Sequence, residues 1–185
     1  MSSVSDQIEL GFTLVGSTAI EDKLQDDVSG TLEFIKSAGI KVWVLTGDKI
    51  ETAINIGISC NLLNVDMETF IIDARSTKAV MLQITQSRAE QKQTELARDN
   101  AVIVAGDSLI KITNNPRIKA EFLELSQSAK VVIACRVSPK QKAEIVTMIR
   151  RNNPTKNTLA IGDGANDVNM ITAAHVGIGI LGLEG

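Results

Sequence analysis

Residues 42–48 read VWVLTGD, a short nonpolar run that ends in a hydroxyl, a glycine and a carboxylate. A bounded nonpolar run of this length predicts a strand of a parallel sheet, because such strands are buried on both faces. Ligands of open α/β sheets bind beyond the carboxyl ends of the strands, where Thr46, Gly47 and Asp48 would lie. Glycine lets the backbone approach a phosphate, and a helix N-terminus beyond it favours an anion. A plain strand followed by an aspartate helix cap explains the same residues equally well.

Similar nonpolar runs recur along the chain and alternate with helical periodicity. Between the runs lie segments such as the one in which Val28, Leu32 and Ile35 share a helix face, with Gly39 at the position of a C-terminal cap. This alternation predicts an α/β fold, a Rossmann-like parallel sheet with helices on both faces. We expect strands at 13–16, 41–46, 69–73, 101–105, 130–135, 158–161 and 176–180.

The segment from about 76 to 100 differs in composition from the rest of the chain. Its central part, 85–98, is almost entirely polar, with glutamines and alternating charges. We expect a polar insert there, either an exposed helix or a mobile segment, and favour a solvated helix over a binding tail.

Composition narrows the classes of function. The net charge of −3 gives no electrostatic reason to expect nucleic-acid binding, and no nonpolar run approaches the length of a membrane span. Cys60 and Cys135 favour buried free thiols over a disulfide. A single histidine, His175, rules out paired-histidine metal sites, and its nonpolar surroundings favour a structural role.

A second motif, LAIGDGAND at 159–167, again runs from a strand into a turn. Asp163 and Asp167 are four residues apart, which suits a Mg²⁺ ion that takes one or two carboxylates together with phosphate and water oxygens. An Asp-Gly turn with a capping aspartate is the simpler alternative. The glycines on both sides of Asp163 favour the metal site, because they allow close approach.

A third motif, RVSPKQK at 136–142, predicts a helix start. Ser138 and Gln141 form a capping box, with proline at the first helical position. Helix N-termini disfavour cations, so Lys142 in this first turn indicates either a solvated side chain or a nearby anion. Beside the first two motifs, a phosphate at the same sheet edge favours the anion.

Together the three motifs resemble the haloacid dehalogenase superfamily, in which a strand-end hydroxyl, a helix-opening lysine and a carboxylate pair surround an aspartyl phosphate. The residues within these motifs are similar to those of the P-type ATPases. The stretches 19–25, 43–49, 135–139 and 162–170 are similar to the type-four subfamily, the phospholipid flippases. Cation pumps typically carry DPP and VNDAP at the first and last of these stretches, so a cation-transporting P-type ATPase is the less favoured alternative. The resemblance covers most of residues 12–185, except 76–100.

The resemblance implies roles around a phosphoryl group delivered by ATP with Mg²⁺. Thr46 would hydrogen-bond the phosphoryl group, Lys142 would neutralise its oxygens, and Asp163 would hold Mg²⁺. Phosphoryl transfer depends mainly on such positioning and charge. The remaining implied roles are Asp167 supporting the metal, Asn166 donating to the phosphate, Gly47 and Asp48 bounding the nucleotide site, Asp22 near the ribose, and Arg136 on the nucleotide side.

The chain departs from the family at the nucleophile, because neither DKTGT nor an Asp-x-Asp pair occurs in it. We therefore expect residues 1–185 to be a single excised piece of a phosphorylation domain, inactive alone. Its expected partners are ATP, the actuator, nucleotide-binding and membrane domains of a parent on whose cytosolic side it lies, a phospholipid bound by those membrane helices, and an accessory subunit. A non-catalytic Mg²⁺ or phosphate-binding module is a third possibility.

The missing nucleophile segment also bears on the sheet. In the superfamily its strand lies between the strands that lead to Thr46 and to Gly162. Unpaired edges there would cost free energy if buried and would invite another chain. We expect the gap to be closed by direct pairing of the flanking strands or by recruitment of residues 1–10, in preference to a strand from a second copy.

Overall fold

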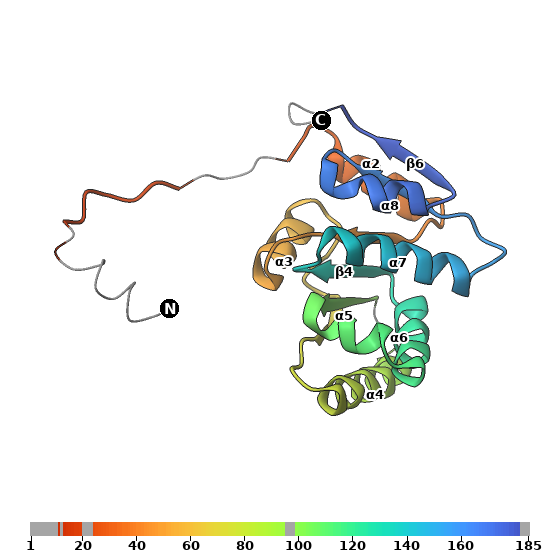
Figure 1. Ribbon diagram of the computed structural model, residues 1–185. Coiled ribbons are helices and arrows are strands. Elements are labelled where there is room, and N and C mark those ends of the chain that lie inside the picture. Colours follow the sequence, from red (N-terminus) through yellow and green to blue (C-terminus); the bar gives the residue numbers. More distant parts are fainter. Residues whose placement is uncertain (1–10, 12, 20–23, 95–98, 182–185) are drawn as a thin grey trace.

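The computed structural model describes residues 11, 13–19, 24–94 and 99–181 (Figure 1). No helix in these ranges is long and nonpolar enough to cross a membrane. The elements in chain order are α2 (Val28–Ser37), β1 (Val42–Leu45), α3 (Ile50–Ser59), β2 (Glu68–Ile72), α4 (Thr77–Thr94), β3 (Asn100–Ala105), α5 (Gly106–Thr113), α6 (Pro116–Ser128), β4 (Val131–Cys135), α7 (Pro139–Asn152), β5 (Leu159–Gly162), the 3₁₀ helix η1 (Ala165–Asp167), α8 (Val168–Ala173) and β6 (Val176–Gly179).

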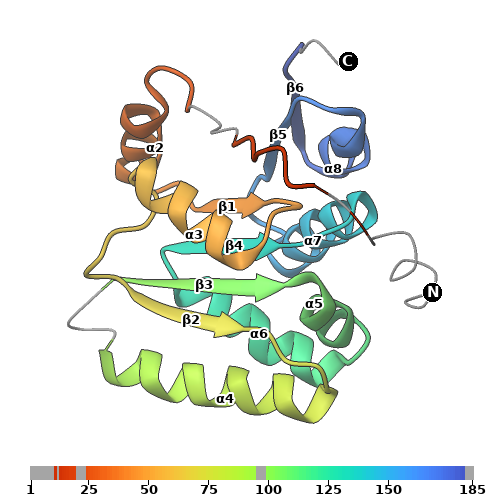
Figure 2. The ribbon, with the colours of Figure 1, turned by 90° about the vertical axis from the view of Figure 1, so that its left-hand side faces the viewer.

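The strands form two parallel sheets. Four strands pair in the order β1-β4-β3-β2, which Figure 2 shows side by side, and β5 pairs with β6 in a separate two-stranded sheet. Because all neighbours within each sheet are parallel, their carboxyl ends meet at one edge, which is where the predicted motifs lie.

Helices cover both faces of the larger sheet, as strands that are nonpolar on both faces require. Val132 and Ala134 of β4 face a core that also contains buried residues of α4, α5, α6 and α7. Val131, Ile133 and Cys135 of the same strand face a second core, which α2 and α3 complete. At the sheet's first face, Trp43 packs edge-on against Phe122 of α6, with ring centroids 6.5 Å apart. The predicted doubly covered α/β sheet is confirmed.

Six of the predicted strands are present, each displaced by at most one residue at either end. The strand predicted at 13–16 is wrong, because these residues have no regular structure and Leu14 and Val15 are 91% and 98% exposed. A two-residue nonpolar run gains nothing as a strand unless a neighbouring strand satisfies its backbone.

The predicted helix boundaries are also confirmed. Gly39 follows α2 with φ of +76°, the left-handed conformation that glycine adopts at a helix C-terminus. At the start of α7, the Gln141 backbone N–H donates to Ser138 Oγ (3.3 Å), and the Ser138 N–H donates to Gln141 Oε1 (2.9 Å). This reciprocal pair is the predicted capping box.

The polar segment at 76–100 contains α4, which is solvated on one face alone. Val80, Ile84, Ser87 and Gln91 form a buried stripe at helical spacing, and Val80 and Ile84 join the main core. The Gln91 amide donates to Asn100 Oδ1 (2.9 Å) and to the Leu125 carbonyl (3.2 Å), which satisfies a polar group inside that stripe. The expectation of a fully solvated helix is therefore wrong on the inner face, while the division of the chain into a domain and an insert stays a prediction.

The expected closure of the sheet gap by direct pairing is wrong. Within the described residues β1 pairs with β4 alone and β5 with β6 alone. Helix α7 packs against η1 and α8, and this helical packing joins the two sheets in place of strand pairing. Recruitment of residues 1–10 concerns a segment outside the described residues.

A pair of substitutions on α4 tests whether this helix belongs to the core. Ile84 is fully buried, so Ile84→Ala is expected to lower the free energy of unfolding by about 2–5 kcal/mol. Leu82 on the same helix is 57% exposed, and Leu82→Ala is expected to change it by less than about 0.5 kcal/mol. Urea unfolding followed by circular dichroism measures both. Small and equal effects would contradict the packing of α4.

Candidate functional site

The first motif forms a tight turn directly after β1. The Thr46 hydroxyl donates to Asp48 Oδ2 (2.7 Å), and the Asp48 N–H donates back to Thr46 Oγ1 (3.1 Å). A Cβ built on Gly47 would meet no atom within 4 Å, so this face of the turn is open to a ligand. The positive end of α3 follows, after Lys49 as its cap residue.

Backbone hydrogen bonds tie this turn to the end of β4. The Thr46 N–H donates to the Ala134 carbonyl (2.9 Å), the Val137 N–H to the Thr46 carbonyl (3.1 Å), and the Arg136 N–H to the Asp48 carbonyl (2.9 Å). Arg136 itself has φ of +52°, a conformation that costs free energy for a residue other than glycine and persists where its surroundings hold it. The first and third motifs are thus held together at the sheet edge.

Lys142 connects the third motif to the second. Its Nζ donates to Asp167 Oδ1 at 2.8 Å, and the two side chains are only 15% and 11% exposed. A cation in the first turn of α7 opposes the helix dipole, and the Asp167 carboxylate provides the compensating negative charge. Within the chain the anion beside Lys142 is therefore the Asp167 carboxylate. The phosphate that the sequence analysis favoured at this position stays a prediction.

Gly162, the last residue of β5, makes this placement of Asp167 possible. A Cβ built on Gly162 would lie 2.3 Å from Asp167 Cβ and 2.8 Å from its Oδ2. Any larger residue would displace the carboxylate from the strand end, and with it the contact to Lys142.

The predicted metal ligands lie on the same turn but differ in environment. Asp163 and Asn166 are exposed, whereas Asp167 is buried beside Lys142. Across the described ranges no three or more His, Cys, Asp or Glu side chains cluster in a way that could hold a metal. Two carboxylates on one turn fit a Mg²⁺ ion that keeps most of its waters and takes its other oxygens from a phosphate. Asp22 lies outside the described residues.

Comparison with known proteins decides the family. The profile of the haloacid dehalogenase-like hydrolases matches residues 25–181. The chain belongs to this family. Among curated relatives, it is 42% identical to the phospholipid-transporting ATPase DNF2 of Saccharomyces cerevisiae and 45% identical to one from Schizosaccharomyces pombe, in both cases over all of its own length. The chain spans only 13% and 15% of those proteins.

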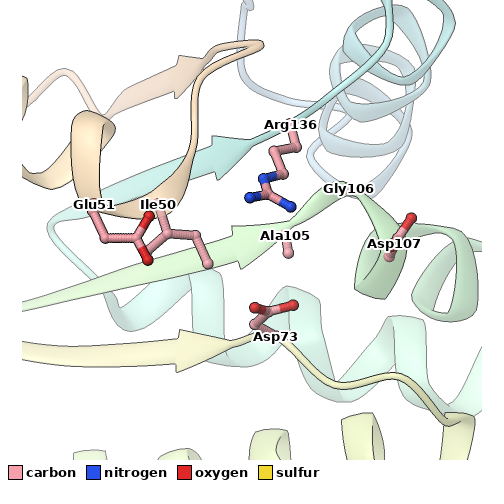
Figure 3. A pocket seen from close by; sticks show the side chains of 7 residues that line it. All are labelled: Ile50, Glu51, Asp73, Ala105, Gly106, Asp107 and Arg136. Atoms are coloured by element: carbon pink, nitrogen blue, oxygen red, sulfur yellow. The ribbon is translucent and has the colours of Figure 1, made fainter. Parts of the chain in front are cut away.

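The haloacid dehalogenase-like fold also forms a small cavity that the motifs did not indicate. It has a volume of about 110 Å³ and lies beyond the ends of β2, β3 and β4. Figure 3 shows the Arg136 guanidinium facing this opening, with carboxylates of Glu51, Asp73 and Asp107 around it. Asp73 directly follows β2 and Asp107 follows β3, so the rule that ligands meet strand ends would have indicated both.

Cys135 is the last residue of β4, directly before Arg136, and its side chain is fully buried. Desolvation, followed by the nearby carboxylates of Asp48 and Glu51, raises the pKa of the Cys135 thiol to about 11. A raised thiol pKa lowers the fraction of reactive thiolate at neutral pH. The predicted buried free cysteine is confirmed.

Alkylation with iodoacetamide tests this environment. At pH 8 a thiol with a pKa of about 11 is ionised in only about one molecule in a thousand, so Cys135 should stay unlabelled in the folded chain. In concentrated urea its labelling should reach that of an ordinary thiol, with Cys60 in the same sample as a second buried site. Peptide mass spectrometry assigns each site. Rapid labelling of Cys135 in the folded chain at pH 8 would contradict the raised pKa.

Proposed function

We propose that this chain is the phosphate-handling part of an ATP-driven phospholipid transporter of the P-type ATPase class, which works through an aspartyl-phosphate intermediate. The relatives named above, which are called phospholipid-transporting ATPases, support this function. The residues within the motifs also support it, because they differ from those typical of cation pumps. The parent would be an integral membrane protein with this part on the cytosolic side.

One observation carries the proposal: hydrogen bonds link all three motifs where β1, β4 and β5 reach their carboxyl ends. Thr46 and Asp48 are tied to the end of β4, and Lys142 at the start of the next helix contacts Asp167. A hydroxyl, an ammonium and carboxylates are thereby grouped as the transfer of a phosphoryl group requires.

Each side chain then has a role that follows from its position. Thr46 donates to a phosphoryl oxygen, and Lys142 lies beside the phosphoryl group while Asp167 orients its ammonium. Asp163, which is exposed on the same turn, binds Mg²⁺ with Asp167 in support, and Asn166 donates to the phosphate. Bound Mg²⁺ would neutralise charge that develops on the phosphoryl oxygens.

Nucleotide contacts belong on the side of the first motif. Gly47 leaves one face of the turn open, and the Asp48 side chain bounds the turn through its hydrogen bond with Thr46. Arg136 faces the adjoining cavity. We assign the ribose contact to Asp22. The phosphorylated aspartate would come from a strand of the parent that lies between the free edges of β1 and β5, and the 185-residue chain alone would not be phosphorylated.

The assignment of Asp163 as the metal ligand is tested in the parent ATPase. Asp163→Asn is expected to lower Mg²⁺-dependent ATP turnover by more than the ~10- to 100-fold that loss of an outer-shell partner costs. Asp66 precedes β2 at the opposite, amino end of the strands and is also exposed, so Asp66→Asn is the matched control with unchanged turnover. Steady-state ATPase assays over a range of Mg²⁺ concentrations measure both.

Two outcomes of this assay would count against the proposal. Normal Mg²⁺-dependent turnover in Asp163→Asn would remove the metal assignment. Equal losses of turnover in Asp163→Asn and Asp66→Asn would show that general destabilisation, and not the loss of a metal ligand, causes the effect.

A further inference from the structure

A reciprocal set of hydrogen bonds joins Thr158 and His175 where β5 and β6 begin. The Thr158 N–H donates to His175 Nδ1 (3.1 Å), and the Thr158 hydroxyl lies 3.0 Å from the same nitrogen. In return, the His175 N–H lies 3.1 Å from the Thr158 carbonyl and 3.2 Å from its hydroxyl oxygen. The phosphate-handling function described above makes no use of either residue.

This geometry requires a neutral imidazole. A ring nitrogen that accepts from a backbone N–H carries no hydrogen, so the ring proton must be on Nε2. Protonation would place a hydrogen on Nδ1 and leave the Thr158 N–H facing a donor. The Thr158 hydroxyl, which already accepts from the His175 N–H, would have to reverse its bond to the ring.

The corner formed by Thr158 and His175 matters because few other elements hold β5 in place. Among the described strands β5 pairs with β6 alone, and Figure 2 shows the two beside α8, apart from the larger sheet. Their backbone ladder starts with the Val176 N–H donating to the Thr158 carbonyl (3.0 Å) and ends with the Ile180 N–H donating to the Gly162 carbonyl (2.9 Å). Asp163 directly follows that last hydrogen bond.

Among the described residues, β5, β6 and α8 offer no carboxylate that would stabilise an imidazolium. The sequences of β5, β6 and α8 contain no charged residue. Arg150 of α7 donates to the Ala173 carbonyl (3.1 Å), two residues before the histidine, and Lys156 lies in the loop that leads to β5. Both are cations, so the exposed His175 ring, once protonated, would exchange its bond to Thr158 for water without gaining an ionic partner.

We propose that neutral His175 is a positioning residue that holds the start of β5 against β6, and that its protonation releases this corner. Imidazole is the side chain that gains charge as the pH falls from 8 to 5. Mild acid would thus loosen the strand that leads to Asp163. We call the hydrogen-bonded pair Thr158 and His175 the latch. That loosening β5 would weaken Mg²⁺ binding rests on the proposed function, whereas the latch itself does not.

Hydrogen exchange of the 185-residue chain tests the latch. After correction for intrinsic rates, protection of the amides in 159–162 and 176–179 should fall about fivefold from pH 7.5 to pH 5.5, as loss of one net hydrogen bond implies. Amides of α6 serve as the internal reference. His175→Asn offers a side-chain oxygen acceptor that does not titrate, and His175→Leu offers no acceptor, so neither variant should show this change with pH.

The deciding comparison is whether the pH response occurs in the wild-type chain and disappears in both variants. A wild-type response that persists in His175→Asn, or a wild-type chain with no response, would overturn the proposal. Because the chain has one histidine, its imidazole ¹H–¹⁵N correlations can also be read without ambiguity. The Nε2–H tautomer is expected at pH 7.5, and a dominant Nδ1–H tautomer would equally overturn the latch. Neither measurement involves ATP or Mg²⁺, so a failure of the latch is distinguishable from a failure of the proposed function.

Discussion

The ion pair between Lys142 and Asp167 is the contact on which the arrangement of this molecule depends. Its two partners come from different sheets, since Lys142 opens the helix after β4 and Asp167 lies in the turn after β5. Both side chains are largely withdrawn from solvent, which strengthens their attraction but makes the loss of either partner costly. The pair therefore aligns two sheets whose described strands do not pair with each other, and it brings the carboxylate turn towards the edge where Thr46 and Asp48 lie.

This dependence follows from how the strands are distributed. Parallel sheets are ordinarily covered on both faces, and their strands are paired on both sides except at the margins. Among the described strands β1 and β5 each pair on one side only, and Leu159 and Ile161 on β5 are 56% and 48% exposed. What joins the β5–β6 unit to the rest is the packing of α7 on η1 and α8 together with the ion pair. The site is consequently assembled by helix packing and one charged contact, with little rigidity contributed by the sheet between its halves.

Much of the fold and of the candidate site follows from local sequence signals. Continuous nonpolar runs predicted six strands, and the capping box at Ser138 placed Lys142 in the first turn of its helix, because both patterns act over a few residues. The carboxyl edge of the larger sheet holds the motif residues of 46–48 and 136–142, and the turn after β5 in the smaller sheet holds those of 163–167. Asp22 lies outside the described residues. The sequence did not indicate that Asp167 would hold Lys142, since that contact depends on how close Gly162 lets the carboxylate come to β5.

The failures have physical causes of a different kind. The buried stripe of α4 was hidden because two of its four members, Ser87 and Gln91, are polar. Partners on β3 and α6 that are distant in sequence satisfy the buried Gln91 amide. Among the described elements no strand pairs with the run at 13–16, and no local pattern can reveal whether such a partner exists. The Arg136 cavity combines residues from the ends of three strands and from α3, so it becomes visible only when these elements are assembled.

The central claim is that Lys142 and Asp167 are energetically coupled, and a double-mutant cycle measures this directly. The free energy of unfolding of the wild-type chain would be compared with those of Lys142→Met, Asp167→Asn and the double variant, by urea titration at fixed ionic strength. We predict that the double variant is less destabilised than the sum of the single variants by about 1–3 kcal/mol, as expected for a charged pair in a largely buried setting. Additivity to within about 0.5 kcal/mol would contradict the account, because residues that do not interact behave in that way.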